Sequence, residues 1–320
     1  MQVATTTTHR QMMQGHTDRV TGVVPLPDKR RIITCSRDSS LRLWDMESGT
    51  QIGDDWRDKG DDKQVLTIAL SPNSKRVASG SEDGTVKLWE VETGKVIARW
   101  TEHSDCVASV CWSPIDERVL SGSWDGTARV WNVESGETML GPIQTEQEYV
   151  FVVAYSPDGS KFATGGYSSA LKIWDSSTGK FLQALGGDDA VVCLTWTSDG
   201  KKLIFCLSTS IKIFDTDTWQ QIAVLKGHKT AISAIALSRN DRLLASTSGY
   251  GHDQTHLWDL DKNVQIGLPL HHEKDVYCAL FSADGMHLVT GCGDTNAYMW
   301  TVGHWCHPKS TSPRTSSVYF

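Results

Sequence analysis

A tryptophan that ends a short apolar run recurs at nearly even intervals along the chain. The run LRLWD contains the first copy, and similar runs follow at spacings of 40 to 45 residues. Six of the 13 tryptophans are explained in this way, and a phenylalanine takes the position in the fifth copy. A period of this length predicts small repeated units that bury their apolar faces against one another. The equivalent positions are Trp44, Trp89, Trp131, Trp174, Phe214, Trp258 and Trp300.

Each repeated unit predicts four short β-strands. An apolar run is followed by a polar turn such as SPDGS (156–160), a second run, a tight turn, the tryptophan run, a glycine turn and a last apolar run. A Ser-x-Asp sequence precedes the tryptophan in three copies, as Ser36/Asp38, Ser81/Asp83 and Ser123/Asp125. A histidine stands 28 to 30 residues before the tryptophan in four copies, as His16, His103, His228 and His272.

Seven such units in register resemble the WD-repeat (WD-40) family, and their regular form is similar to that of fungal WD-repeat array proteins. The resemblance covers residues 15–302 and implies an all-β fold, a seven-bladed β-propeller of four-stranded antiparallel blades. The repeats are expected at residues 15–49, 60–94, 102–136, 145–179, 186–219, 227–263 and 271–302.

The last repeat ends without a fourth apolar strand, and the missing strand is expected from the other end of the chain. Residues 7–13 stand before Gly15 and His16 as an outer strand stands before the next repeat. We therefore predict that residues 7–13 complete blade seven and remove an open sheet edge. The propeller is expected to occupy residues 1–302, and residues 303–320, rich in Ser, Thr, Pro and Lys, are expected to form a disordered tail.

The residue types His, Ser and Asp also belong to hydrolase triads, but here they recur in several units. The resemblance implies instead a structural tetrad in which Asp holds His, His engages Ser, and Ser meets the indole N–H. Incomplete sets are expected in the other blades, with Asp61 at the histidine position of blade two and Glu146, Gly166 and Ser168 in blade four. The complete tetrads are expected to be His16, Ser36, Asp38 and Trp44, and His103, Ser123, Asp125 and Trp131.

Neither a metal site nor a cofactor site is expected, and the chain is not expected to be an enzyme. His272 has a tetrad assignment, and His304, Cys306 and His307 lack the spacing of a tetrahedral zinc site. The acidic segment 53–63 lacks the order of a calcium loop, and the sequence contains neither a GxxxxGK[ST] loop nor a GxGxxG turn.

Composition bounds the partners and the compartment. The net charge of −7 disfavours direct binding of nucleic acid, which usually needs a basic surface. The N-terminal residues do not resemble a secretory signal, and no apolar run reaches the length of a membrane helix. Eight cysteines without a CxxC pair favour a reduced protein of the cytoplasm or nucleus that is not secreted.

The resemblance implies a partner-binding top face around the mouth of the central channel. Residues beside the first valine of each innermost strand, and the residue inside Ser-x-Asp, are expected to line it. Aromatic residues and arginines are enriched in binding hot spots. The alternative is that the ring side chains pack between degraded blades. The candidate binding residues are Trp124, Tyr149, Phe151 and Tyr167 on blades three and four, and Arg19 and Arg37 on blade one.

The function expected from the resemblance is a non-catalytic scaffold or adaptor that binds a protein or peptide. A monomeric propeller acting within a complex is expected, without membrane attachment. A chromatin- or RNA-associated peptide reader is the alternative, which a concentrated acidic or basic rim would favour. An enzyme that uses the channel would need additional Asp, Glu or His side chains there, and none is left over from the tetrads.

Overall fold

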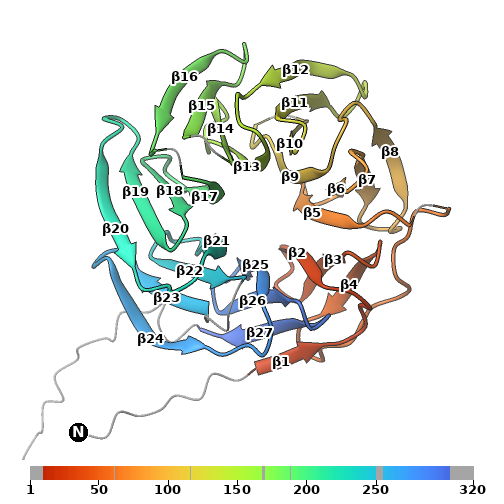
Figure 1. Cartoon of the computed structure of the whole chain (residues 1–320). Helices are drawn as coiled ribbons and strands as arrows, with labels where there is room; N and C mark the ends of the chain where they lie inside the picture. The colour runs from red at the N-terminus through yellow and green to blue at the C-terminus, as the bar shows by residue number, and fades with distance from the viewer. Residues whose placement is uncertain are drawn as a thin grey trace, which may run out of the picture.

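The computed structural model is a closed ring of seven antiparallel β-sheets (Figure 1). It describes residues 10–60, 62–115, 117–167, 170–187, 189–249 and 255–302. All regular elements within these ranges are β-strands, and no helix long and apolar enough to cross a membrane occurs among them. The seven-bladed propeller predicted from the repeat is confirmed.

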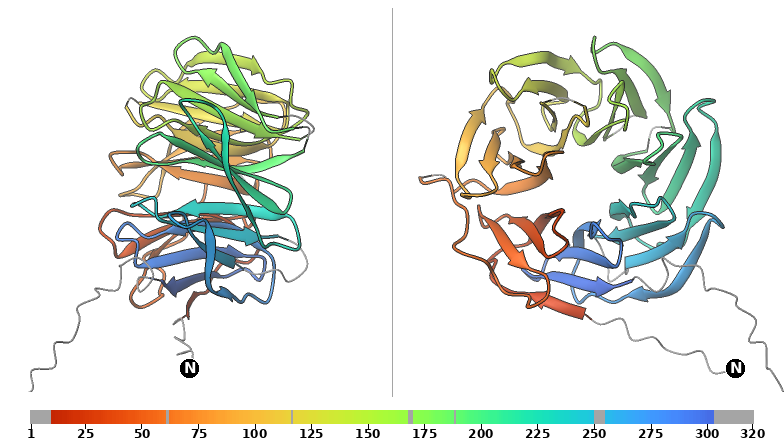
Figure 2. Two further views of the ribbon diagram at one scale, coloured as in Figure 1. Left: turned by 90° about the vertical axis from the view of Figure 1, so that its left-hand side faces the viewer. Right: turned by 180° about the vertical axis from the view of Figure 1, so that it is seen from behind.

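Within a blade the chain runs from the innermost strand to the rim. In blade four, for example, the order in the sheet is β13-β14-β15-β16, with each strand paired to the next. Figure 2 shows the ring edge-on and from behind, with the inner strands around the centre and the outer strands at the rim. Blades one to three contain Val20–Pro25 (β2), Arg31–Ser36 (β3) and Leu41–Asp45 (β4); Val65–Leu70 (β5), Arg76–Ser81 (β6), Val86–Glu90 (β7) and Val96–Trp100 (β8); and Val107–Trp112 (β9), Arg118–Ser123 (β10), Thr127–Asn132 (β11) and Thr138–Gln144 (β12).

The remaining blades follow the same plan. Blades four and five contain Val150–Tyr155 (β13), Lys161–Gly166 (β14), Leu171–Asp175 (β15) and Phe181–Leu185 (β16), then Val191–Trp196 (β17), Lys202–Leu207 (β18), Ser210–Asp215 (β19) and Gln221–Lys226 (β20). Blades six and seven contain Ile232–Leu237 (β21), Leu243–Ser248 (β22), Thr255–Asp259 (β23) and Val264–Leu270 (β24), then Val276–Phe281 (β25), His287–Cys292 (β26), Ala297–Thr301 (β27) and Arg10–Met13 (β1).

The outer position of blade one is irregular. Its sheet has three strands, β2-β3-β4, and the segment 50–56 pairs with β4 through two isolated bridges, Trp44 with Gln51 and Leu41 with Trp56. Gly53, with φ of 69°, lies between the two bridges. Between the two bridges the segment advances five residues while β4 advances three, so the segment contains two more residues than a regular partner strand. Asp54 and Asp55 follow Gly53 in this stretch, and a regular strand does not form there. Six blades thus have four regular strands, and in the first an irregular segment takes the fourth position.

The two ends of the chain meet in blade seven, as predicted. β1 pairs antiparallel with β27, in a register that sets Met13 opposite Ala297. Residues 7–9 of the predicted closing strand lie outside the described residues, as does the predicted tail 303–320.

The core is divided among the seven interfaces between neighbouring blades. Each of the seven buried apolar clusters draws its residues from two adjacent blades. Glycines on the second strands allow this approach: a Cβ at Gly80 would lie 2.7 Å from the carbonyl oxygen of Val107 in the next blade. Because every blade is one side of two such interfaces, the ring depends on all of them.

The seven described cysteines are free thiols. Burial raises the pKa of the Cys35 thiol to about 12 and that of Cys111 to about 12. These side chains therefore stay neutral at physiological pH and act as small apolar residues.

Candidate functional site

The top face is the side of the ring that carries the turns between the second and third strands of each blade. On it, in blades one to four and in blade seven, the residue inside the Ser-x-Asp position donates its N–H to the carbonyl of a residue beside the innermost strand. Trp124 donates to Cys106 over 2.9 Å, and Tyr167 donates to Tyr149 over 3.0 Å. The same bond joins Arg37 to Arg19 over 3.2 Å. The two predicted classes of surface residue therefore lie side by side.

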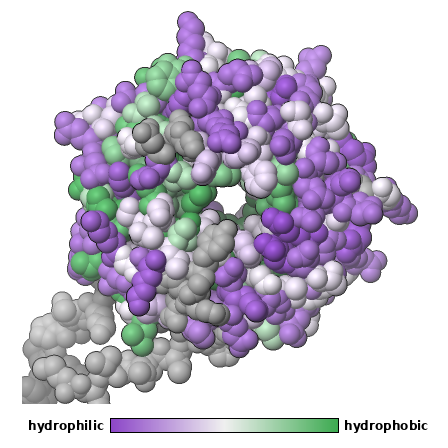
Figure 3. All heavy atoms as spheres, in the orientation of Figure 1, coloured by the Kyte–Doolittle hydropathy of each residue, from purple (hydrophilic) through white to green (hydrophobic). Residues whose placement is uncertain are grey.

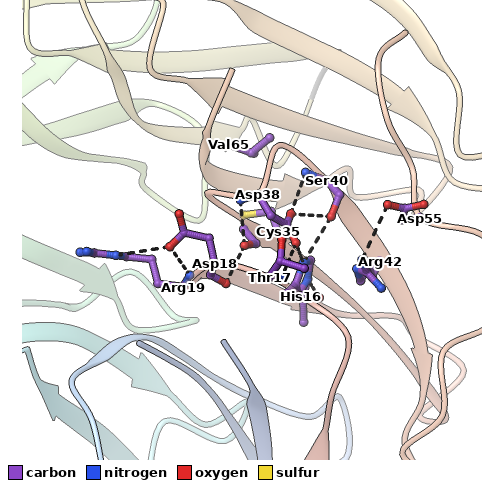
Figure 4. A network of polar contacts seen from close by, with 12 residues as sticks. His16, Thr17, Asp18, Arg19, Cys35, Asp38, Ser40, Arg42, Asp55 and Val65 are labelled. Carbon is purple, nitrogen blue, oxygen red and sulfur yellow. Dashed lines mark hydrogen bonds and ion pairs between the residues drawn. The ribbon is translucent and has the colours of Figure 1, made fainter. Parts of the chain in front are cut away.

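Beneath these turns, blade one holds a chain of buried hydrogen bonds (Figure 4). His16 Nδ1 lies 2.8 Å from a carboxylate oxygen of Asp38, and His16 Nε2 lies 2.7 Å from Oγ1 of Thr34. The indole N–H of Trp44 donates to the same Thr34 oxygen over 2.7 Å. A neutral imidazole with its proton on Nδ1 satisfies every bond, since the Thr34 hydroxyl then donates to Nε2.

Blade three repeats this chain. His103 Nδ1 lies 2.8 Å from Asp125, its Nε2 lies 2.8 Å from Oγ of Ser121, and Trp131 donates to Ser121 over 2.8 Å. The Trp131 ring also stacks on Trp100, with centroids 5.2 Å apart. The histidine, aspartate and tryptophan assignments in these two blades agree with the contacts observed.

The predicted serines, Ser36 and Ser123, are not members of the tetrads. Their hydroxyls instead donate to the backbone carbonyls of Asp18 and Asp105. Thr34 and Ser121, two residues earlier on the same strands, carry the hydroxyl that meets the indole.

Strand geometry explains this correction. Trp44 pairs with Ile32, so Ser36 lies four residues farther along the strand, about 13 Å away. Thr34 lies only two residues from Ile32 and on the same face, within reach of the indole.

The other blades keep some of these hydrogen bonds. The tryptophan donates to Ser79 in blade two, and His228 with Ser246 and His272 with Thr290 repeat the bond from Nε2 in blades six and seven. In blade seven Asp294 accepts a bond from the hydroxyl of Tyr298 instead of holding the histidine. Blade five has the apolar Phe214, which stacks on Phe205.

Blade four replaces the histidine with Gln147, whereas the sequence predicted Glu146 there. Gln147 is buried, and its amide donates to the carbonyl of Ala170 over 3.0 Å. Glu146 has a φ of 55° and turns outward to pair with Lys172. This left-handed residue shifts the inward position by one. The other predicted substitutes Asp61 and Ser168 lie outside the described residues.

These hydroxyls are not placed for nucleophilic chemistry. Thr34 and Ser121 are fully buried, so no substrate can reach them. Their oxygens also accept a hydrogen bond from the indole N–H, which makes them weaker nucleophiles. The observed chain of bonds is therefore structural.

The tetrad carboxylates make stability depend on pH. Burial opposes ionisation of Asp38 and Asp125, but hydrogen bonds from His16 and His103, and from nearby hydroxyl and N–H groups, hold the pKa of both carboxyls well below the usual range. Because the carboxyl pKa is lower in the folded than in the unfolded chain, each carboxylate stabilises the fold at pH values above its unfolded pKa, near 4. This stabilisation is lost as the pH falls below that value.

We expect the free energy of unfolding to fall below pH 4, by up to about 1.4 kcal/mol per pH unit for each carboxylate. Urea titrations between pH 3 and 7 measure this slope. Asp125→Asn lowers stability at pH 7 and flattens the acid slope, whereas Glu134→Gln, at an exposed position in the same blade, leaves both unchanged. An unchanged acid slope in Asp125→Asn contradicts the assignment.

The predicted aromatic side chains meet in one cluster, which we call the aromatic cluster. Tyr149 immediately precedes β13 and Phe151 projects from it, Trp124 reaches in from the turn of blade three, and Tyr167 follows β14. Trp124 lies 5.8 Å from Tyr149 and 6.4 Å from Phe151, between ring centroids; Tyr167 lies 6.2 Å and 6.5 Å from the same two rings. Tyr149 and Phe151 are half-buried, while Trp124 is 39% and Tyr167 47% exposed.

Two acidic side chains, Glu148 and Asp105, lie near Tyr149 of the aromatic cluster, and Glu82 lies near the adjacent Cys106. Glu148 beside the phenol, with a contribution from Asp105, raises the pKa of Tyr149. Burial raises the pKa of the Cys106 thiol to about 11, with contributions from Asp105 and Glu82. Glu82, Asp105 and Glu148 form no ion pair with any cation in the described part of the chain.

The predicted arginines lie apart from the aromatic cluster, on blade one. The Arg19 guanidinium donates to the hydroxyl of Tyr277 over 3.1 Å and stands 5.1 Å from the centroid of that ring. The Nε of Arg37 is buried and has no hydrogen-bond partner among the described residues. The structure thus links blade one to blade seven through Tyr277, a contact that the sequence pattern did not predict.

A hollow of about 510 Å³ lies on the face opposite the top face, between blades four and five. Its wall includes Pro157, Trp196 and Trp219. The Trp196 indole N–H is buried and has no hydrogen-bond partner in the part of the chain that the structure describes. In the equivalent position of blade three, Trp112 donates to the carbonyl of Ala69. No sequence signal distinguishes these two tryptophans. Among the described residues no group of three or more His, Cys, Asp or Glu is arranged to hold a metal ion.

The WD40 family model (WD domain, G-beta repeat) matches six segments, at residues 7–45, 57–90, 94–132, 140–175, 219–259 and 263–301. Together they cover more than half of the chain. The longest unmatched stretch, 176–218, holds most of blade five, where Phe214 replaces the tryptophan.

Similar curated proteins include the WD repeat-containing protein slp1 of Schizosaccharomyces pombe, 25% identical over 56% of this chain and 38% of slp1. The small ribosomal subunit protein RACK1 of Glycine max is 31% identical over 49% of this chain and 40% of its own length. Protein FIZZY-RELATED 3 of Arabidopsis thaliana is 26% identical over 46% and 32%, respectively. The matched region thus spans less than half of each relative. With six matched repeats and seven blades in one ring, the chain belongs to the WD40 family.

Proposed function

We propose that this chain is a non-catalytic interaction platform that binds a segment of a partner protein on its top face. The aromatic cluster carries the proposal: four rings from two blades converge, and two of them stay more than a third exposed. Exposed aromatic clusters of this kind are typical of binding hot spots.

The chemistry around the cluster favours a peptide over a nucleic acid. The carboxylates Asp105 and Glu148 near Tyr149 would repel phosphate groups. Figure 3 shows the opening at the centre of the ring with apolar and polar side chains around it, a mixture that suits an extended peptide. The described cysteines are free thiols, which fit a reducing compartment, so we propose a monomeric propeller within a complex of the cytoplasm or nucleus.

A random peptide library displayed on phage tests the proposal. Peptides selected on the wild-type chain are expected to bind Trp124→Ala/Tyr167→Ala at least tenfold more weakly. The matched control is Phe181→Ala/Leu182→Ala, which removes equally exposed apolar side chains from the outer strand β16. Selected peptides that bind all three proteins alike, or a failure to select any peptide, would overturn the proposal.

A further inference from the structure

We propose that the aromatic cluster and the carboxylates around it bind a cationic side chain, an alkylammonium or guanidinium group, of a basic peptide. This inference rests on the proposed function and adds the chemistry of the ligand. It assigns the cluster to one charged group, with the rest of the peptide lying across the top face.

The ring arrangement suits a cation. Tyr149 and Phe151 are stacked, with centroids 6.3 Å apart, and the more exposed Trp124 and Tyr167 each contact both of them. Trp124 comes from the preceding blade and Tyr167 from their own blade, so the two half-buried rings lie between the exposed ones. A cation resting there meets several electron-rich ring faces at once.

Charge complementarity selects a cation over a neutral apolar group. Asp105 and Glu148 are exposed and Glu82 is half-buried, and no described cation neutralises them. Both Asp105 and Glu148 lie close enough to Tyr149 to raise the pKa of its phenol. A basic side chain over the rings would therefore be attracted by at least two carboxylates.

The same face already contains one contact of this type. The guanidinium of Arg19 lies over Tyr277 on the neighbouring blade, 5.1 Å from its centroid. The chain thus supplies its own cation to the aromatic side chain of blade seven. In contrast, no cation of the described residues lies over Trp124, Tyr149, Phe151 or Tyr167. The second aromatic site is open to a cation from outside.

The first test uses the peptides selected by display. We expect wild-type-specific sequences to be enriched in Lys or Arg, and replacement of the basic residue by Gln to weaken binding about tenfold in calorimetry. Glu148→Gln and Asp105→Asn should each weaken binding several-fold and reduce its salt dependence, whereas the exposed Glu134→Gln on the opposite face should not. Lys and Arg versions of one peptide distinguish the two cations.

The second test needs no peptide. Tetramethylammonium chloride, titrated against sodium chloride at equal ionic strength, is expected to shift the indole N–H resonance of Trp124 and not that of Trp219. Trp124→Phe assigns the resonance. Peptides that depend on Trp124 but bind equally well with Gln in place of the basic residue would overturn the cation proposal and leave the proposed function intact. Loss of dependence on Trp124 itself would overturn both.

Discussion

Replacement of Met13 by aspartate should prevent the ring from closing and lower the free energy of unfolding by at least about 4 kcal/mol. Met13 is 1% exposed and belongs to the cluster that joins blade one, through Ile32 and Trp44, to blade seven, through Val289. The described residues of this cluster are all apolar, so an introduced carboxylate has no cation among them to compensate its desolvation. The same substitution also removes the side chain that anchors β1 on β27, leaving a sheet edge exposed.

The neighbouring residue of the same strand provides the control. Met12 is 42% exposed, so Met12→Asp introduces the same charge on the same strand but leaves the interface intact. It should change the free energy of unfolding by less than about 0.5 kcal/mol. Urea unfolding followed by tryptophan fluorescence measures both variants, and size-exclusion chromatography detects association through the exposed edge. Equal effects of the two substitutions would show that closure does not depend on this strand.

The arrangement of the blades could be predicted from the sequence because it depends on a feature repeated seven times. Any single tryptophan run is weak evidence, but six tryptophan runs and the Phe214 run at one period resemble the WD-repeat pattern. That resemblance implied seven blades, and the missing outer strand of the last repeat pointed to the N-terminal strand. The irregular outer segment of blade one was not predicted. Its additional residues around Gly53 alter hydrogen bonding without changing the apolar pattern.

Predictions within the blades were less accurate where one residue of displacement matters. The Ser-x-Asp sequence predicted Ser36 as the tetrad hydroxyl, but the indole of Trp44 donates to Thr34. In blade four the left-handed conformation at Glu146 moves Gln147 inward, and no spacing rule reveals such a residue. The WD-repeat resemblance placed the four aromatic residues on one face, with Trp124 and Tyr167 at equivalent positions of adjacent blades and Tyr149 and Phe151 on either side of the first valine of β13. The pairing of Arg19 with Tyr277 joins residues 258 positions apart and required the closed ring.

Replacement of Trp131 by alanine should destabilise the chain more than any equivalent change in the degenerate blade five. Trp131 is 1% exposed, stacks on Trp100 and donates to Ser121. Its loss leaves a large cavity, which costs about 3–5 kcal/mol, and removes the donor from a buried hydroxyl, which costs about 1 kcal/mol more. Phe214→Ala also leaves a cavity, but the ring it removes is smaller and has no polar partner.

Conservative variants separate the packing contribution of Trp131 from its hydrogen bond. Trp131→Phe keeps most of the ring and loses the N–H, so about 1–2 kcal/mol of the loss should remain. Ser121→Ala should destabilise by about 1–3 kcal/mol, because the indole N–H of Trp131 then has no acceptor. In Ser123→Ala the indole keeps its bond, and its N–H resonance should stay in place while it moves in Ser121→Ala. Chemical denaturation and indole resonances measure these effects. An indole resonance that shifts only in Ser123→Ala would restore the serine of Ser-x-Asp to the tetrad. Equal stability losses in Trp131→Ala and Phe214→Ala would show that the buried hydrogen bonds add little to the stability that packing provides.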